Sequence, residues 1–163
     1  MRAPLVVVVT GMPAAGKTTI AEVLSRDLRL PLVSRDKIKE RLYDTLGVGD
    51  LEWSGRLGGA AFALLFDSAR LMIESGHSVM LEANFFRGTE QEFSALPSHR
   101  AIQIHCEAPL DVLIARYAGR PRHERHHARS GETEGTARTL SERRSRTAGP
   151  PRPSDRRRYI TSR

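Results

Sequence analysis

The amino-acid sequence predicts an α/β fold in which helices flank a parallel sheet. Short apolar runs rich in β-branched residues alternate with segments that repeat apolar residues at helical spacing. The first apolar run, residues 5–10, suits a strand buried on both faces, and residues 20–24 have helical spacing. Between them, Gly11 to Thr18 reads Gly-Met-Pro-Ala-Ala-Gly-Lys-Thr and matches the pattern G-x-x-x-x-G-K-[ST]. This strand, loop and helix form the context that a phosphate-binding loop requires.

Each fixed position of this loop pattern has a physical reason. Gly11 and Gly16 allow backbone angles and close approach that a side chain would forbid, so successive N–H groups can hold a polyphosphate. The helix that begins near Lys17 adds its positive end, Lys17 can reach the β- and γ-phosphates, and Thr18 can ligate Mg²⁺. The alternative is a glycine-rich turn that binds nothing. We expect a nucleotide-binding segment made of Gly11, Met12, Pro13, Ala14, Ala15, Gly16, Lys17, Thr18 and Thr19.

Length and composition restrict the class of protein. At 163 residues the chain is long enough for one domain with a substantial core. No apolar run approaches the length of a membrane span, and the run after Pro4 leads into the loop instead of a signal-peptide cleavage site. Cys106 is the sole cysteine, which excludes an internal disulfide and fits a reducing compartment. We expect a cytoplasmic protein with no membrane partner.

The net charge of +7 is concentrated in the last third of the chain. Residues 1–115 contain 12 Lys and Arg against 14 Asp and Glu, whereas residues 116–163 contain 14 against 5. Charge therefore gives no argument that the folded part binds nucleic acid.

Residues 121–163 differ in composition from the rest of the chain. They contain few apolar residues, so we expect a largely disordered, Arg-rich tail with at most a short helix over residues 139–145. Such a tail could contact RNA or another anionic surface weakly and non-specifically. Its three close histidines lack carboxylate or Cys partners at ligand spacing, so a metal site is not expected there. The abrupt change near Pro121 also suggests that the reading frame changes there, which translation of the other frames would test.

The first predicted elements place a carboxylate at one edge of the sheet. A helix over residues 17–27 ends at Leu28-Arg29-Leu30-Pro31, a short strand covers residues 32–34, and a second helix covers residues 37–46. Asp36 falls where this strand gives way to the helix, and the carboxyl ends of strands line the ligand crevice of an open α/β sheet. Asp36 should face the same crevice as the loop, either as a functional carboxylate or as the cap of the helix.

A long helix is predicted after a linker over residues 47–50. Residues 54–75 repeat apolar side chains at three- and four-residue steps, which is typical of a helix that packs on a core. Gly58 and Gly59 weaken the pattern and could mark a bend. Trp53 and Phe62 either face substrate or, as we favour, are buried by packing.

A third strand, residues 78–84, ends in polar residues at the same predicted edge. Glu82 at its tip is a candidate for orienting the waters of Mg²⁺, and the alternatives are a helix cap or an ion pair with an Arg. Asn84 is a weaker candidate for contact with substrate or phosphate. A short helix should follow over residues 89–93, with Thr89 as its cap.

A fourth strand covers residues 101–107, and Pro109 opens a further helix. We interpret His105 and Cys106 as strand residues rather than catalysts. Arg116 and Arg120 lie four residues apart on one face of that helix. These two arginines could clamp phosphate groups, or they could form a solvated basic face.

Residues 1–120 resemble a group of small P-loop kinases. The group includes polynucleotide 5′-hydroxyl kinases, chloramphenicol phosphotransferase-like and zeta-toxin-like proteins, which are often described as AAA-type ATP-binding domains. The resemblance rests on residues 11–18, on Ser34-Arg35-Asp36 with Lys39, on residues 81–85, and on Arg116 with Arg120.

This resemblance implies a three-layer P-loop NTPase fold with strand order 2-3-1-4-5, and the use of ATP and Mg²⁺. It implies that Asp36 is the general base for the acceptor hydroxyl and that Arg116 and Arg120 lie on a lid over the phosphates. The sequence departs from the family where Lys37 and Lys39 stand in place of a frequent Arg. Nothing after Arg120 resembles the rest of the lid or a fifth strand. We therefore expect the order 2-3-1-4 with the fifth strand missing, and a domain that ends near residue 120.

Together these residues predict an ATP-dependent kinase that transfers the γ-phosphoryl group of ATP to a hydroxyl of a small molecule or of a nucleic-acid 5′ end. The expected catalytic residues are Lys17, Asp36, Arg116 and Arg120, and the expected metal residues are Thr18 and Glu82. Two alternatives stay open. The chain could bind ATP with little or no kinase activity because the C-terminal part of the fold is absent, or it could bind nucleic acid through its basic tail.

Overall fold

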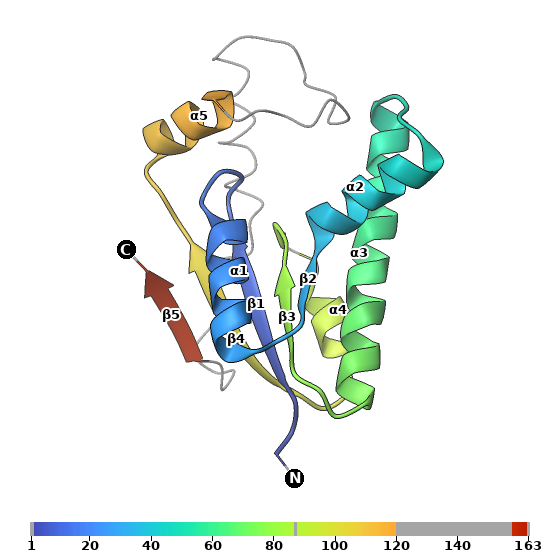
Figure 1. Ribbon diagram of the computed structural model, residues 1–163, viewed down its shortest axis with the longest axis vertical. Helices are drawn as coiled ribbons and strands as arrows, with labels where there is room; N and C mark the ends of the chain where they lie inside the picture. Colours follow the sequence, from blue (N-terminus) through green and yellow to red (C-terminus); the bar gives the residue numbers. More distant parts are fainter. Residues whose placement is uncertain (1, 87, 120–157, 163) are drawn as a thin grey trace.

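The computed structural model describes residues 2–86, 88–119 and 158–162, and Figure 1 shows its elements. In this part of the chain the strands are β1 (Leu5–Gly11), β2 (Leu32–Ser34), β3 (Val79–Glu82), β4 (Arg100–Cys106) and β5 (Arg158–Ser162). The helices are α1 (Lys17–Leu28), α2 (Arg35–Leu46), α3 (Leu51–Glu74), α4 (Glu90–Ser94) and α5 (Leu110–Gly119). The predicted bounds of the first eight elements, and the predicted start of the ninth, differ from these by three residues at most.

The strands form one parallel sheet in the order β2-β3-β1-β4-β5. The α/β fold class and the order 2-3-1-4 of the first four strands are therefore confirmed. β1 occupies the middle of the sheet, and four consecutive valines in it are almost fully buried. A strand covered on both faces needs a continuous apolar run, which is why residues 5–10 do not alternate with polar residues.

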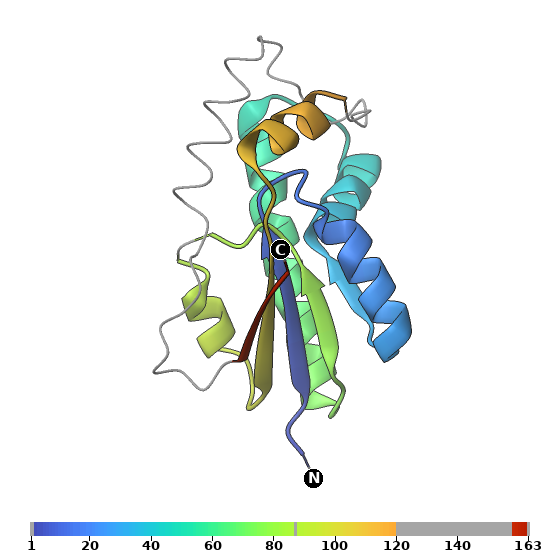
Figure 2. The ribbon, with the colours of Figure 1, turned by 90° about the vertical axis from the view of Figure 1, so that its left-hand side faces the viewer.

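Helices cover both faces of the sheet, so the fold has three layers (Figures 1 and 2). Val6 and Val8 of β1 pack in one apolar cluster with Leu65 and Ala69 of α3. The alternate residues of β1 pack on the other side, in a cluster with members on α1 and α5. Because successive side chains of a strand point to opposite faces, a single run of valines serves both cores.

The expectation that the fifth strand is missing was wrong. Residues 158–162 form β5, which pairs in parallel with β4, from Ile102 opposite Arg158 to Cys106 opposite Ser162. β5 reads Arg-Tyr-Ile-Thr-Ser, and its aromatic and β-branched residues favour a strand although the composition around them is polar. The alternative of a chain with little or no kinase activity depended on a missing fifth strand. The presence of β5 removes that argument. The predictions for residues 121–157, including the disordered tail and the histidines, fall outside the described residues.

Helix α3 runs without interruption from Leu51 to Glu74, through Gly58 and Gly59, which weakened the helical pattern of the sequence. Asp50 caps this helix by accepting a hydrogen bond from the backbone N–H of Trp53, and the Trp53 indole donates to the Gly47 carbonyl oxygen. Phe62 packs edge-on against Phe85 and Phe86. Although α3 is long, none of the helices in the described ranges is apolar over enough of its length to cross a bilayer.

Cys106 at the end of β4 is expected to be unreactive in the native protein. The residue is 1% exposed, and burial raises the pKa of its thiol, which leaves little of the reactive thiolate at neutral pH. We expect iodoacetamide to label Cys106 only after urea unfolds the chain, as mass spectrometry of the intact protein would show. Labelling of the native chain as fast as the unfolded chain would contradict this burial.

Candidate active site

The loop between β1 and α1 has a backbone that few residue types allow. Gly11 has a φ of 140°, and a Cβ atom added there would lie 2.1 Å from the carbonyl oxygen of Cys106. Gly16 has a φ of 88° and Ala14 a φ of 65°, both in the left-handed region. Turns of this kind direct successive N–H groups to one side and form a concavity suited to an anion. The two glycines of the pattern thus stand where the backbone requires them.

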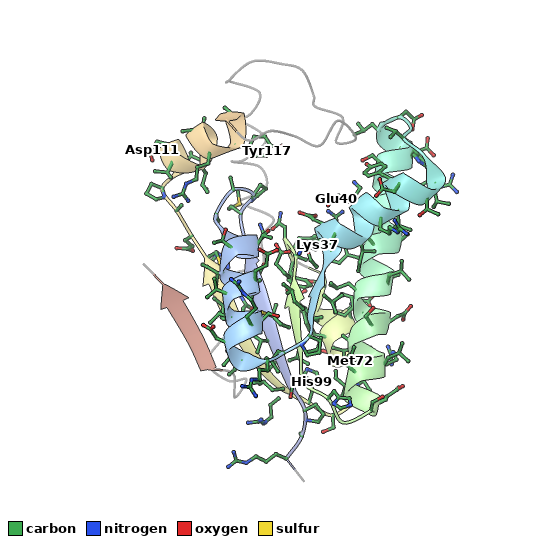
Figure 3. All side chains as sticks on the ribbon, in the orientation of Figure 1. Lys37, Glu40, Met72, His99, Asp111 and Tyr117 are labelled. Carbon is green, nitrogen blue, oxygen red and sulfur yellow. The ribbon has the colours of Figure 1, made fainter. Side chains whose placement is uncertain are left out.

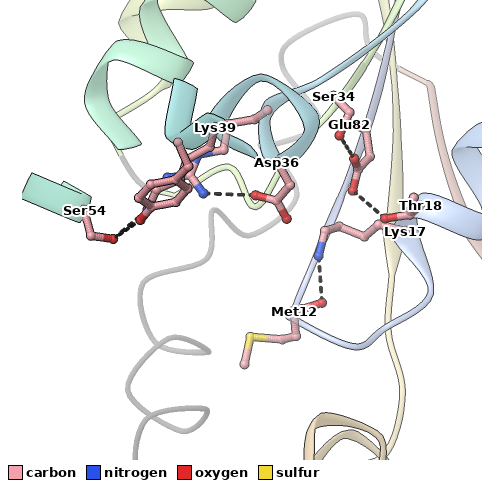
Figure 4. Close-up of polar contacts among 10 residues, drawn as sticks. Met12, Lys17, Thr18, Ser34, Asp36, Lys39, Ser54 and Glu82 are labelled. Atoms are coloured by element: carbon pink, nitrogen blue, oxygen red, sulfur yellow. Dashed lines mark hydrogen bonds and ion pairs between the residues drawn. The ribbon is translucent and has the colours of Figure 1, made fainter. Parts of the chain in front are cut away.

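Lys17 is the first residue of α1 and lies over the loop. Only 9% of its surface is exposed, and its Nζ donates a hydrogen bond of 2.9 Å to the Met12 carbonyl oxygen (Figure 4). The first turn of α1 carries no acidic residue, and its N-cap, Gly16, has no side chain to offer. The positive end of this helix therefore faces the loop without a carboxylate of its own, which favours an anion there.

Glu82 joins the ends of two strands, β3 and β2, to the first turn of helix α1. It is the last residue of β3, is 2% exposed, and accepts hydrogen bonds from Thr18 Oγ1 at 3.3 Å and from Ser34 Oγ at 2.5 Å (Figure 4). Among the described residues Glu82 belongs to no salt bridge and caps no helix. Carboxylate and hydroxyl oxygens are ligands that Mg²⁺ prefers.

Asp36 lies in the first turn of α2, directly after β2. Its side chain is 58% exposed, and its Oδ1 is 3.0 Å from Nη1 of Arg35. The N-cap of α2 is Ser34, so the interpretation of Asp36 as the helix cap was wrong. Figure 4 shows Asp36 between Glu82 on one side and Lys39 on the other. Asp36 is thus an accessible carboxylate at the carboxyl edge of the sheet.

A second polar group joins α2 to α3. Lys39 is 9% exposed and donates a hydrogen bond of 3.0 Å to Ser54 Oγ, and the Tyr43 hydroxyl lies 2.6 Å from the same oxygen. The guanidinium of Arg35 stacks over the ring of Phe62, with its Cζ 5.1 Å from the ring centroid. These contacts hold the side of α2 next to Asp36 against α3.

Helix α5 lies at the same end of the sheet as the loop (Figures 1 and 3). Met12 of the loop belongs to the same apolar cluster as Leu113 and Tyr117 of α5, which holds the helix beside the loop. Arg116 is in the last turn of α5 and is exposed. Arg120 falls outside the described residues.

An ion pair between Glu22 and Lys37 links α1, which begins with Lys17, to α2, which carries Asp36. Nζ of Lys37 lies 2.8 Å from the Glu22 carboxylate. The hydrogen bond with Lys37 lowers the pKa of Glu22 below its ordinary value, and the same bond raises the pKa of Lys37. Both side chains are exposed, so the pair orients the surface between the helices more than it stabilises the fold.

A family model described as an AAA domain matches residues 6–146. The chain belongs to this family. The matched segment contains the loop, Asp36, Glu82 and α5, which together make up the described part of the candidate site.

Three relatives illustrate what this AAA domain is similar to. A candidate kinase from Chloroflexus aurantiacus J-10-fl has a crystal structure that superposes with a TM-score of 0.82 at 35% identity, over 98% of this chain and 88% of that one. A sugar kinase from Janibacter sp. HTCC2649 superposes with a TM-score of 0.63 at 16% identity, over 98% and 85%. The Pnkp1/Rnl/Hen1 RNA repair complex gives a TM-score of 0.62 at 15% identity, over 89% and 46%. The last two show the fold alone, which is the fold of P-loop kinases.

Among curated proteins, an uncharacterised protein of Mycobacterium tuberculosis is 28% identical over 124 residues. The alignment covers 69% of this chain and 25% of the relative, so this chain matches about a quarter of the length of that protein.

Sequence reasoning missed several contacts of this AAA domain. Ser34 and Lys39 appeared in the sequence pattern, but their hydrogen bonds to Glu82 and Ser54 were not foreseen. Nor was the ion pair between Arg35 and Asp36, although the two residues are adjacent. Asn84 was foreseen as a weak candidate, and its buried Oδ1 has no hydrogen-bond partner in the described part of the chain.

Proposed function

We propose that the chain is an ATP-dependent kinase that transfers the γ-phosphoryl group of ATP to a hydroxyl of a small molecule or of a nucleic-acid 5′ end. The observation that carries the proposal is the convergence of Lys17, the hydrogen bond between Thr18 and Glu82, and Asp36 at one edge of the sheet (Figure 4). This edge is where open α/β folds bind their ligands. The kinase-type fold of the chain supports the same reading.

The loop residues fit the phosphates of a nucleotide. Gly11 and Gly16 allow the backbone angles of the loop, and the N–H groups of the loop and of the first turn of α1 would hold the phosphate oxygens. Lys17 would leave the Met12 carbonyl oxygen and place its charge on the β- and γ-phosphates. The segment from Gly11 to Thr19 is the proposed nucleotide-binding segment.

Thr18 and Glu82 fit Mg²⁺. The Thr18 hydroxyl would ligate the ion, and Glu82 would orient ion-bound waters from its buried position beside Ser34. When bound, Mg²⁺ neutralises negative charge on the phosphate oxygens.

Asp36 would accept the proton of the acceptor hydroxyl. As the hydroxyl oxygen forms a bond to the γ-phosphorus, the bond from that phosphorus to the β–γ bridging oxygen breaks and ADP leaves with the electron pair. The proton passes to the Asp36 carboxylate, which Arg35 holds in place at 3.0 Å. Arg116, in the last turn of α5, and Arg120, the next arginine in the sequence, would stabilise charge on the phosphoryl group during transfer.

The substitution Asp36→Asn tests the proposal. We expect it to lower kcat by about 10²- to 10⁴-fold while leaving Mg·ATP affinity unchanged, because it removes the proton acceptor and not a phosphate contact. ADP release would be measured with glycerol, D-glycerate, D-ribose, D-ribose 5-phosphate and a 5′-hydroxyl oligonucleotide as acceptors. Asp44→Asn, on an exposed part of the same helix, serves as the matched control and should keep full turnover. Full turnover in Asp36→Asn would contradict the assigned role.

A further inference from the structure

Ser34 stands at the N-cap of α2, but its side chain does not cap the helix. Serine is a preferred N-cap residue because its hydroxyl oxygen can accept a hydrogen bond from a backbone N–H of the first turn. The Ser34 side chain makes no such bond. Its hydroxyl instead donates to Oε2 of Glu82 at 2.5 Å. Ser34 thus has the residue type of a helix cap, while its side chain serves a carboxylate on another strand.

The register of the sheet brings this hydroxyl to Glu82. β2 and β3 are parallel, and Ser34 and Glu82 are paired as the last residues of the two strands. Two positions earlier, Leu32 and Met80 are paired in the same way, and both pack in the apolar cluster on the α1 side of the sheet. Residues two apart in a strand point to the same face. Ser34 and Glu82 therefore both point toward α1, where Thr18 lies.

The two oxygens of the Glu82 carboxylate have different donors. Thr18 Oγ1 donates to Oε1 at 3.3 Å, and Ser34 Oγ donates to Oε2 (Figure 4). Glu82 is 2% exposed and Ser34 is 5% exposed, so bulk water has little access to this group. A hydrogen bond to each oxygen fixes the direction of the carboxylate, as outer-shell partners do for the ligands of metal sites.

We propose that Ser34 is a positioning residue for the metal site, whose hydroxyl holds the Glu82 carboxylate in the orientation that meets Thr18. The inference rests on the proposed function, which assigns Thr18 and Glu82 to Mg²⁺. Ser34 acts through Glu82 and contacts neither metal nor nucleotide itself. Because Ser34 directly precedes α2, the same hydrogen bond ties the metal site to the start of the helix that carries Asp36.

Loss of the Ser34 hydroxyl would leave Oε2 of Glu82 without a donor from the described residues. A buried charged oxygen that lacks a hydrogen bond is costly, so the carboxylate would turn away from its present direction. Glu82 would then no longer present Oε1 beside Thr18, and the waters of Mg²⁺ would lose a fixed acceptor. The loop itself would keep its backbone, because Ser34 makes no contact with it through this hydroxyl.

The metal dependence of nucleotide binding tests the proposal without turnover. Calorimetry measures the affinity for the β,γ-imido analogue of ATP in excess Mg²⁺ and again in EDTA, and the ratio of the two affinities is the readout. We expect Ser34→Ala to lower this ratio by about 10-fold, the effect of losing a hydrogen bond to a charged group, and to leave the affinity in EDTA unchanged. An unchanged ratio overturns the proposal. An equal loss in both buffers overturns it too, because Ser34 would then support only the fold.

Ser78 provides a matched control. Its Oγ accepts a hydrogen bond of 2.9 Å from the backbone N–H of Leu5, at the amino ends of β1 and β3 and so at the opposite edge of the sheet. Ser78→Ala removes a partly buried serine hydroxyl without touching the proposed metal site. We expect this variant to keep the ratio of the unaltered chain. A fall as large as that of Ser34→Ala would contradict a specific role for Ser34.

Two further variants separate the bond to Glu82 from a role at the start of α2. Glycine serves at an N-cap almost as well as serine but has no hydroxyl, so Ser34→Gly should lower the ratio as much as Ser34→Ala does. Ser34→Thr keeps a hydroxyl and should keep most of the ratio. A normal ratio in Ser34→Gly, or a ratio in Ser34→Thr as low as that of Ser34→Ala, would overturn the proposal. Circular dichroism checks that each variant is folded.

This test and the test of the kinase function fail separately, because the ratio requires nucleotide and metal but no acceptor. A chain that shows the expected ratios and phosphorylates no acceptor would contradict the kinase function and support the role of Ser34. A chain that phosphorylates an acceptor and keeps its ratio in Ser34→Ala would contradict the role of Ser34 alone. An unaltered chain that does not bind the analogue in either buffer would overturn both.

Discussion

Gly11→Ala is expected to lower the free energy of unfolding by about 3 kcal/mol or more, the largest stability effect of any substitution considered for the loop. The added Cβ would lie 2.1 Å from the carbonyl oxygen of Cys106, and Gly11 is paired with Cys106 in the β1–β4 ladder. Because this obstacle is backbone and not the end of a flexible side chain, β1 and β4 would have to separate. The φ of 140° adds strain for any residue with a side chain. Urea denaturation followed by circular dichroism measures the change.

Gly16→Ala provides the control for this prediction. Gly16 has a φ of 88°, but a Cβ there meets nothing within 4 Å, so only the backbone strain of about 1 kcal/mol is expected. Equal losses of stability in the two variants would show that the contact with Cys106 is not the source of the Gly11 effect.

Lys17→Met is expected to lower kcat/KM for Mg·ATP by about 10²- to 10³-fold, as removal of one preorganised donor to a developing charge does in other enzymes. Lys17 is held over the loop by the Met12 carbonyl oxygen, and its Nζ is the cationic group that the loop pattern assigns to the β- and γ-phosphates. Methionine keeps much of the side-chain volume, so packing around α1 is retained. Calorimetric titration of Mg·ATP and steady-state kinetics measure the loss.

Lys37→Met separates this effect from a general loss of positive charge. Lys37 lies on α2, is exposed, and pairs with Glu22, so its removal should leave nucleotide affinity unchanged. If Lys17→Met bound Mg·ATP as tightly as the unaltered chain, the loop would not be the nucleotide site.

The parts of the fold that the sequence predicted are those whose cause is local. The run of valines in β1, the glycines of the loop and Lys17 at the start of α1 follow one another in the chain, so spacing alone identifies them. Glu82 could be foreseen because parallel strands end at one edge and their last residues meet there. The Thr18–Glu82 hydrogen bond is consistent with that argument.

What the sequence could not predict depends on contacts between distant segments. β5 is a short strand in a polar surrounding, and only its pairing with β4 distinguishes it from a loop. Lys39 and Ser54 belong to different helices, and neither periodicity nor composition indicates their hydrogen bond. Gly58 looked like a flaw in a helical pattern, whereas it accommodates the ends of Arg35 and Lys39. In the sequence, a glycine that makes room for side chains of a neighbouring helix cannot be distinguished from a glycine that bends the helix in which it lies.

The most direct test of the central claim is the fate of the γ-phosphate of ATP. ³¹P nuclear magnetic resonance of the full chain with Mg·ATP and the acceptor panel should show ADP together with a new phosphate-ester signal. The Asp36→Asn chain should show neither on the same time scale. ADP with inorganic phosphate as the sole other product, or unchanged ATP with every acceptor, would contradict the assignment of the chain as a kinase.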